Sequence, residues 1–264
     1  MVSKHGVLAY VAGESCAGEA AAGRIIMSEL SETVSGDVLA KLGELDTPTV
    51  CNALEIVSPD RRGYGYTTTP FFTPRPHLKP IVGFARTGKI RAQTEPTASA
   101  EELTRMRLGY YDHIGQGHGP TITVIQDLDD HPGYGAWWGE VNTNIHQGLG
   151  SLGVITNGSV RDLDDSAEGF QLLAGMAGPS HAWVRVEEFA TSVQVHGMAV
   201  DPGDLIHADQ HGAVVIPLEV ADQVAAAAAD IAAKEAVLIT ASQQPGFNAD
   251  VIYEITGVDR DGGH

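Results

Sequence analysis

Strand-like runs recur along this chain, and they constrain its fold more than any other feature. Each run is short and rich in β-branched or other apolar residues, a composition that is typical of buried strands. The runs are IVGFARTGKIRA (81–92), TITVIQDL (121–128), AWVRVEEF (182–189), SVQVHGMAV (192–200) and LIHADQHGAVVIP (205–217).

Helix signals lie between and after these runs. Asp46 or Thr47 can cap a helix, and the proline that follows suits its first turn. Ser99 with Glu102 three residues later has the form of a capping box. An alanine-rich helix is expected after Pro217. Helices interspersed with short strands predict a single α/β domain.

The length of 264 residues and the hydrophobic content of 43% are typical of a globular protein. No run reaches the roughly 18 apolar residues of a membrane helix, so we expect no contact with a membrane. The N-terminal segment lacks a basic start, which favours a non-secreted protein. Cys16 and Cys51 are too few and too far apart for a disulfide framework, so we expect a cytoplasmic location.

The charge balance limits the ligands that this protein can bind. Thirty-four acidic against sixteen basic residues give a formal net charge of −18, which repels nucleic acid and anionic lipid over most of the surface. We therefore expect no nucleic-acid partner. An anionic ligand needs a local positive charge on this acidic protein, and Arg161 or a bound cation is a candidate for it.

The stretch GVITNGSVRD (153–162) has two interpretations. Asn157-Gly158 between apolar runs is a strong hairpin signal, with Arg161 and Asp162 as a charged end of the hairpin. Alternatively, Arg161 binds an anion and Asp162 binds a cation. The residues of this stretch alone do not decide between them.

Larger segments around this stretch point to a family. WGEVNTNIHQGLGSLGVITNGSVRDLDD (138–165), VDPGDLIHADQHGAVVIP (200–217), LDTPTVCNALE (45–55) and GFARTGKI (83–90) resemble the RraA-like family. That family holds the class II, metal-dependent 4-hydroxy-4-methyl-2-oxoglutarate aldolases and the RraA-like regulators of an RNA-degrading enzyme. The resemblance covers roughly residues 40–240.

The resemblance implies an architecture. It is a compact α/β/β swivelling-type sandwich domain, assembled as a homotrimer or homohexamer. The composition of residues 1–36, rich in Ala, Gly and Ser and then in helix formers, predicts an N-terminal helical extension in addition. On this basis we divide the chain into an extension (1–36), a catalytic domain (37–240) and a C-terminal tail (241–264).

The family motif maps onto Gly139, Glu140, Arg161, Asp162 and Asp165. The resemblance implies that Asp162 binds Mg²⁺ or Mn²⁺, hard cations that prefer oxygen ligands and often keep several waters. Arg161 would bind the substrate and stabilise the developing enolate, because its planar guanidinium suits carboxylate and enolate oxygens. Asp165 would orient Arg161 or metal-bound water.

A helix that starts just after Gly139 would present the backbone amides of Val141 and Asn142 to an anion. The resemblance implies that Gly139, Val141 and Asn142 bind the carboxylate of a 2-oxo acid. Glu140 would organise the metal-bound water that acts as acid or base. The family usually has Asp at this position, and Glu is one methylene longer.

Other positions are less specific. Asn52 and Asn157 stand where the family commonly has Asp, but neither is a metal ligand there. Glu235 falls roughly where aldolase members bring an acid from a neighbouring subunit. The candidates that we expect to be structural are Trp137, Trp138, His146, His196, His207 and His211, since adjacent aromatics and single histidines most often pack in cores.

The resemblance implies a carbon–carbon lyase. Its reaction would be retro-aldol cleavage of a 4-hydroxy-2-oxo acid, which releases pyruvate, or decarboxylation of oxaloacetate through the same pyruvate enolate. One alternative is a non-catalytic RraA-type regulator that docks on an RNA-degradation enzyme, which the acidic surface would suit. Another keeps the metal and the 2-oxo acid but performs a different enolate step.

Overall fold

The computed structural model describes residues 34–117 and 119–260. The helical extension predicted for residues 1–36 falls almost entirely outside the described residues. The helices are α2 (Gly36–Leu42), α3 (Thr47–Val57), η1 (Pro59–Arg61), α4 (Ala100–Ile114), α5 (Glu140–Gly148), η2 (Leu218–Val220), α6 (Ala221–Ser242) and α7 (Ala249–Thr256).

The strands form one large sheet, one small sheet and a hairpin. The large sheet has the order β12-β11-β1-β2-β4-β6, and β8 also pairs with β1. The small sheet has the order β3-β5-β7, and β9 pairs with β10. The strands are β1 (Ile81–Arg91), β2 (Thr121–Asp127), β3 (Ala136–Trp138), β4 (Ser151–Thr156), β5 (Ser159–Val160), β6 (Gln171–Leu173), β7 (Met176–Ala177), β8 (Arg185–Phe189), β9 (Val193–Val195), β10 (Met198–Val200), β11 (Leu205–Asp209) and β12 (Gly212–Ile216).

Both faces of the large sheet are buried. On β2, Ile122 and Val124 pack with the hairpin residues of β9 and β10, whereas Ile125 packs with the aromatic residues of α4 and β3. The strands are almost continuously apolar because side chains alternate between two covered faces. The α/β prediction is confirmed: α4 and the small-sheet strands β3 and β5 pack on one face of the sheet, and the β9–β10 hairpin packs on the other.

The predicted helix starts are confirmed in detail. The Asp46 side chain accepts a hydrogen bond from the amide of Thr49. Ser99 and Glu102 form both bonds of the capping box at the start of α4. Each cap satisfies amides that have no partner within their own helix.

The hairpin interpretation of Asn157-Gly158 is wrong. β4 and β5, on either side of this turn, belong to different sheets, and each pairs in parallel with its neighbours. The Asn157 side chain accepts a bond from the Asp127 amide (2.7 Å) and donates one to the Asp127 carbonyl (3.0 Å). The turn therefore leads the chain from the large sheet into the small one, with Asn157 fixed to the end of β2.

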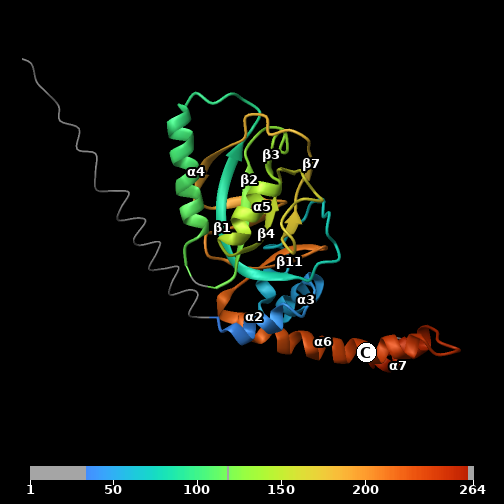
Figure 1. The fold of residues 1–264 in the computed structure, drawn as a ribbon. Helices are drawn as coiled ribbons and strands as arrows, with labels where there is room; N and C mark the ends of the chain where they lie inside the picture. The colour runs from blue at the N-terminus through green and yellow to red at the C-terminus, as the bar shows by residue number, and fades with distance from the viewer. Residues whose placement is uncertain (1–33, 118, 261–264) are drawn as a thin grey trace, which may run out of the picture.

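Three helices cover one end of the large sheet. Figure 1 shows α2, α3 and α6 together there, and the end of α6 extends past the sheet with α7. The boundary predicted at residue 240 falls inside α6, and α7 lies in the predicted C-terminal tail. Within the described residues, no helix is long and apolar enough to cross a membrane.

Buried polar groups hold α3 against the β11–β12 hairpin. The carboxylate of Asp209 accepts bonds from the amides of Thr47 (3.0 Å) and His211 (2.8 Å). Burial alone would raise the pKa of Asp209, but these hydrogen bonds and a bond from the His211 side chain outweigh it and lower the pKa. The carboxylate is therefore favoured in the folded state.

We predict that Asp209→Asn lowers the free energy of unfolding at pH 7 by about 1–3 kcal/mol, because one of the two buried carboxylate oxygens that accept backbone amides becomes an NH₂ group that cannot accept. Since the folded-state pKa is lowered, the contribution is full at neutral pH and disappears as the pH falls through that pKa. Urea denaturation at several pH values measures both effects. Asp230→Asn, at an exposed position on α6, is the control; equal stabilities of the two variants at pH 7 would contradict the prediction.

Candidate functional site

The residues of the predicted site follow two neighbouring strands. β3 and β5 pair in parallel, with Trp138 opposite Val160. The Trp138 carbonyl then accepts a bond from the amide of Arg161 (2.8 Å). Because parallel strands end at the same edge of a sheet, Gly139 after β3 and Arg161 after β5 lie next to each other. The predicted helix start after Gly139 is confirmed: α5 begins at Glu140.

The backbone holds Asp162 in an uncommon conformation. Its φ angle is +50°, in the left-handed region that few residues other than glycine, asparagine and aspartate adopt. Its carbonyl accepts bonds from the amides of Asp165 (3.1 Å) and Ser166 (2.8 Å) and from the Ser166 hydroxyl (2.8 Å). Such conformations concentrate at functional sites, where surrounding contacts fix them. This turn aims the Asp162 side chain back at α5.

The Asp162 carboxylate lies at the N-terminus of α5. Its Oδ2 accepts a bond from the Glu140 amide (3.3 Å) and is 3.4 Å from Nε of Arg161. Within the described residues, both contacts of the carboxylate use Oδ2, and about a third of each of the two charged side chains is exposed. A carboxylate oxygen, a guanidinium and the positive end of a helix thus meet at one place.

Gly139 makes this arrangement possible. A Cβ atom at this position would lie 2.5 Å from Asp162 Oδ2 and 3.2 Å from Cγ of Arg161. The backbone is extended here, so the need for glycine comes from this close approach alone.

A cleft of about 410 Å³ opens beside these residues. The residues that line it are Arg107, Tyr111, Trp137, Gly139, Val141, Asn142, Arg161, Asp162, His181 and Val184. Five predicted site residues are therefore in one cleft: Gly139, Val141, Asn142, Arg161 and Asp162. The volume lies within the range of about 300–1,000 Å³ that is usual for small-molecule sites.

The other predicted acids are outside the lining of the cleft. Glu140 is exposed on the first turn of α5 and contributes its backbone amide to Asp162. Asp165 is exposed and contributes its amide to the Asp162 turn. Glu235 is exposed on α6 and is not part of the cleft lining of its own chain. Catalytic roles for their carboxylates stay predictions.

Sequence reasoning missed the wall that α4 forms. Arg107 and Tyr111 lie one helical turn apart on α4, and His181 and Val184 approach from the segment before β8. The sequence predicts a helix that begins after Ser99, and Arg107 and Tyr111 are four residues apart in it. This spacing was an available signal. It placed two side chains on one face without showing which face meets the site.

Hydrogen bonds connect α4 to the start of α5. The Tyr111 hydroxyl donates to Oδ1 of Asn142 (2.6 Å), and Nδ2 of Asn142 donates to the Trp137 carbonyl (2.6 Å). Burial raises the pKa of the Tyr111 hydroxyl, although the positive charge of Arg107 opposes the shift. Tyr111 therefore remains a donor at neutral pH and fixes Asn142 at the edge of the cleft.

The buried side chain of His146 connects α5 to Tyr110 of α4. Its Nδ1 is 2.6 Å from the Asn142 carbonyl, and its Nε2 is 2.6 Å from the Tyr110 hydroxyl. The carbonyl can only accept, so Nδ1 carries the proton and Nε2 accepts from Tyr110. Burial lowers the pKa of His146 to about 4. Its full burial against Trp138, with ring centroids 4.5 Å apart, favours the structural role expected for both residues.

Three other histidines that we expected to be structural also contact the protein. Nε2 of His207 donates to the carbonyls of Leu42 (3.1 Å) and Leu45 (3.0 Å), and Nε2 of His196 donates to the Thr156 carbonyl (2.8 Å). His211 contacts the carboxylate of Asp209. These contacts favour the structural interpretation of all three side chains.

The donor set limits the kind of metal that the cleft could hold. Among residues 34–117 and 119–260, no group of three or more His, Cys, Asp or Glu side chains is arranged to hold a metal. Asp162 offers one partly exposed carboxylate at the cleft. This fits a hard cation such as Mg²⁺ or Mn²⁺, which can take its other ligands from water and substrate, and does not fit structural zinc.

A family model supports the assignment that the fold and site suggest. The model described as RraA-like, Aldolase/RraA, matches residues 47–215 and therefore both strands that form the cleft edge. The chain belongs to the RraA-like family. No curated protein matches the chain.

Solved structures share the fold. RraAS2 of Streptomyces coelicolor, described as an unusual member of the RNase ES inhibitor RraA family, is 21% identical with a TM-score of 0.61, over 77% of this chain and 96% of that one. An uncharacterized protein of Pseudomonas syringae pv. tomato str. DC3000 is 20% identical with a TM-score of 0.59, over 81% and 96%. A structure described among novel cellulases from microbes associated with the gut ecosystem is 16% identical with a TM-score of 0.62, over 76% and 87%. At these identities the similarity establishes the fold alone.

We predict that Gly139→Ala lowers the affinity of the protein for Mn²⁺ at least tenfold, because the new Cβ would displace the Asp162 carboxylate. Electron paramagnetic resonance of free Mn²⁺ measures the affinity. Gly148→Ala is the matched control, since a Cβ there, on the same helix, meets no atom within 4 Å. Equal Mn²⁺ affinity in both variants, with normal circular dichroism, would contradict the prediction.

Proposed function

We propose that this protein is a divalent-metal-dependent carbon–carbon lyase that acts on a 2-oxo acid. The proposed reaction is retro-aldol cleavage of a 4-hydroxy-2-oxo acid with release of pyruvate, or decarboxylation of oxaloacetate. The observation that carries the proposal is the meeting of Asp162, Arg161 and the N-terminus of α5 in one cleft. Membership in the family described as Aldolase/RraA supports it.

The α5 N-terminus suits the acid group of the substrate. Val141 and Asn142 lie in the first turn of α5 and line the cleft. The backbone amides of a first helical turn have no partner within the helix, and the helix dipole favours an anion there. We assign the substrate carboxylate to these amides. In a protein of net charge −18, an anionic substrate requires such a local region of positive potential.

Asp162 would hold the metal through the carboxylate oxygen that protein groups leave free, with Mg²⁺ or Mn²⁺ as the cation. The bound metal would supply Lewis-acid polarisation of the 2-oxo group. Arg161 would donate hydrogen bonds to the same oxygen of the substrate, which gains negative charge when the C3–C4 bond breaks. Fixed donors at a developing oxyanion are commonly worth about 3–4 kcal/mol each. In the retro-aldol reaction a base would remove the proton of the C4 hydroxyl, and C4 would leave as the carbonyl carbon of the second product; in the decarboxylation C4 would leave as CO₂. In both, the electrons of the C3–C4 bond would form the pyruvate enolate, which is protonated at C3.

The second candidate is a non-catalytic regulator that docks on an RNA-degradation enzyme. The net charge of −18 favours it, since an acidic surface suits a basic partner. RraAS2, which shares the fold, is described as a member of an RNase ES inhibitor family. We rank this candidate second because docking gives no reason for the strained Asp162 turn. We also propose a homotrimer or homohexamer, the assembly in which Glu235 could approach a neighbouring cleft.

We predict that the protein catalyses metal-dependent exchange of the pyruvate methyl protons in D₂O and that Asp162→Asn lowers the rate at least a hundredfold. Asparagine tolerates the φ of +50° and can accept the Glu140 bond, so the variant removes the negative charge with little strain. Asp164→Asn, at an exposed neighbour, is the control. Proton NMR of the methyl signal, with Mg²⁺ and with EDTA, measures the exchange.

Loss of exchange in Asp162→Asn and in EDTA, with the control unchanged, would support the lyase. Absence of exchange in the folded, metal-supplied wild type would contradict it. The regulator would then become the leading candidate, and binding to a basic RNA-degradation partner would be the next measurement.

A further inference from the structure

The lining of the cleft offers few groups that could act as the base of the retro-aldol reaction. Its two arginines do not give up their protons in a protein. Asp162 would hold the metal, and its Oδ2 already accepts the Glu140 amide. The Tyr111 hydroxyl donates to Asn142, and burial raises its pKa. Of the ten lining residues in the described part of the chain, His181 is left as the side chain type that commonly takes and gives protons near neutral pH.

The turn that carries His181 is held tightly against β3. The Ser180 carbonyl accepts a bond from the Ala136 amide (2.8 Å), and the His181 carbonyl accepts one from the Val184 amide (3.0 Å). A Cβ atom at Gly135 would lie 2.3 Å from the His181 carbonyl oxygen, so glycine permits this close approach. The backbone of His181 is therefore fixed at the start of β3.

The residue after His181 has a strained backbone. Ala182 has a φ angle of +47°, in the left-handed region that the Cβ of alanine disfavours. Its amide donates to the Ser180 hydroxyl (3.1 Å), and the Trp183 amide donates to the Ala92 carbonyl (3.0 Å). Surrounding contacts thus maintain an unfavourable conformation beside a residue of the cleft, and such conformations concentrate at functional sites.

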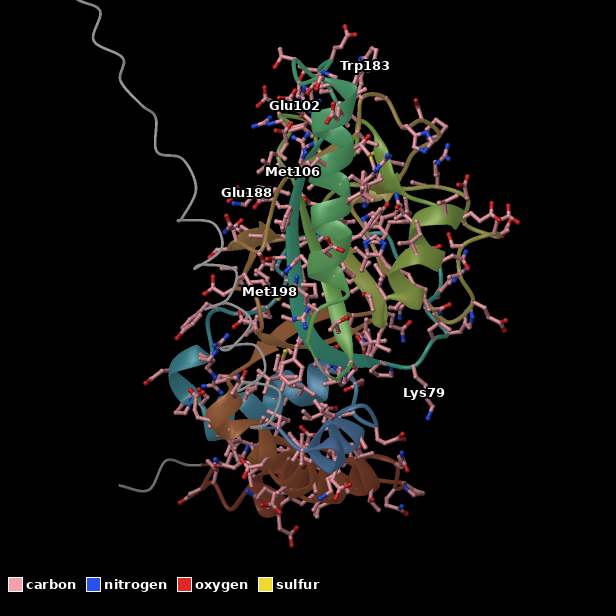
Figure 2. The ribbon with its side chains drawn as sticks, turned by 60° about the vertical axis from the view of Figure 1, so that its left-hand side comes forward. Lys79, Glu102, Met106, Trp183, Glu188 and Met198 are labelled. Atoms are coloured by element: carbon pink, nitrogen blue, oxygen red, sulfur yellow. The ribbon has the colours of Figure 1, made fainter. Side chains whose placement is uncertain are left out.

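The imidazole of His181 is available to a ligand. It is exposed, and in the part of the chain that the structure describes its side chain makes no hydrogen bond or ion pair. His146 and His207, by contrast, are fully buried and contact backbone carbonyls. The turn lies at the surface, where Figure 2 shows Trp183, two residues after His181, at the same end of the molecule as Glu102.

His181 and Asp162 contact opposite ends of β3. Gly135 before this strand lies against the backbone of His181, and Gly139 after it lies against the Asp162 carboxylate. Four residues of extended chain span roughly 13 Å at most, and Trp137 between the two glycines also lines the cleft. A small ligand bound at Asp162 can therefore extend along β3 toward the His181 side chain.

We propose that His181 is the general base of the retro-aldol reaction. The inference rests on the proposed function, because it takes the 2-oxo acid head to lie at Asp162, Arg161 and the start of α5. A neutral imidazole nitrogen of His181 takes the proton of the C4 hydroxyl, and the O–H electron pair forms the second bond of the carbonyl at C4. The electrons of the C3–C4 bond form the pyruvate enolate. His181 returns its proton to water, and the enolate takes a proton from water at C3, so the number of protons is unchanged.

The two proposed reactions differ in their need for this base. Cleavage of 4-hydroxy-2-oxoglutarate into pyruvate and glyoxylate requires loss of the hydroxyl proton, whereas oxaloacetate has no such proton to lose when it releases CO₂. We expect His181→Gln to lower the kcat of cleavage at least a hundredfold, the usual contribution of a general base. The KM should change less than threefold, since the head of the substrate provides the binding. Decarboxylation, measured above the rate with Mg²⁺ alone, should fall less than threefold, and proton NMR of the pyruvate methyl signal follows both reactions.

Matched variants separate proton transfer from a structural role. His131→Gln removes an exposed histidine that is not part of the cleft lining, and we expect it to keep both rates. His181→Ala leaves space for a small base, and we expect added imidazole to raise its rate of cleavage at least tenfold. Undiminished cleavage by His181→Gln, or an equal loss of cleavage and decarboxylation, would overturn the inference.

The outcome is separable from that of the proposed lyase. Exchange of pyruvate methyl protons tests the head of the site and involves no C4 hydroxyl. Exchange in the wild type, together with cleavage that does not depend on His181 or with no cleavage of 4-hydroxy-2-oxoglutarate at all, would overturn the role of His181 and leave the lyase standing. Absence of exchange in the folded, metal-supplied wild type would contradict the lyase and the base together.

Discussion

The arrangement of the site depends on the parallel pairing of β3 and β5. These strands are only three and two residues long, yet their register places Trp138 opposite Val160 and brings Gly139 to Arg161. A slip of one residue would turn the following side chains to the other face. The side-chain amide of Asn157 accepts a hydrogen bond from the Asp127 amide and donates one to the Asp127 carbonyl. These two bonds fix where β5 begins. The large sheet thus sets the position of the small one.

The same constraint explains why the motif is spread over the sequence. Twenty-one positions separate Glu140 from Arg161, and the intervening chain forms α5, β4 and the turn into β5. This is one helix and one strand of the large sheet, and a connection between parallel strands needs a dozen residues or more. The spacing in the motif therefore measures the length of that connection.

Local signals predicted much of the fold. The capped starts of α3 and α4 and the buried strands follow from side-chain chemistry within a few residues. Of the two interpretations of the stretch around Asn157-Gly158, the hairpin was wrong because a hairpin and a crossing between sheets share the same residues; only the partners of β4 and β5 distinguish them. The α4 wall was missed for a similar reason: helical spacing groups Arg107 with Tyr111, but packing between distant segments decides what they face.

The buried pair of His146 on α5 and Tyr110 on α4 affects how the cleft responds to pH. With the pKa of His146 lowered to about 4 and that of Tyr110 raised, neither group changes its charge near neutral pH. The two groups therefore stay neutral in that range and do not alter the electrostatic potential at the α5 N-terminus. A response of the cleft to acidity in that range would have to originate in groups at its surface or in the ligand itself.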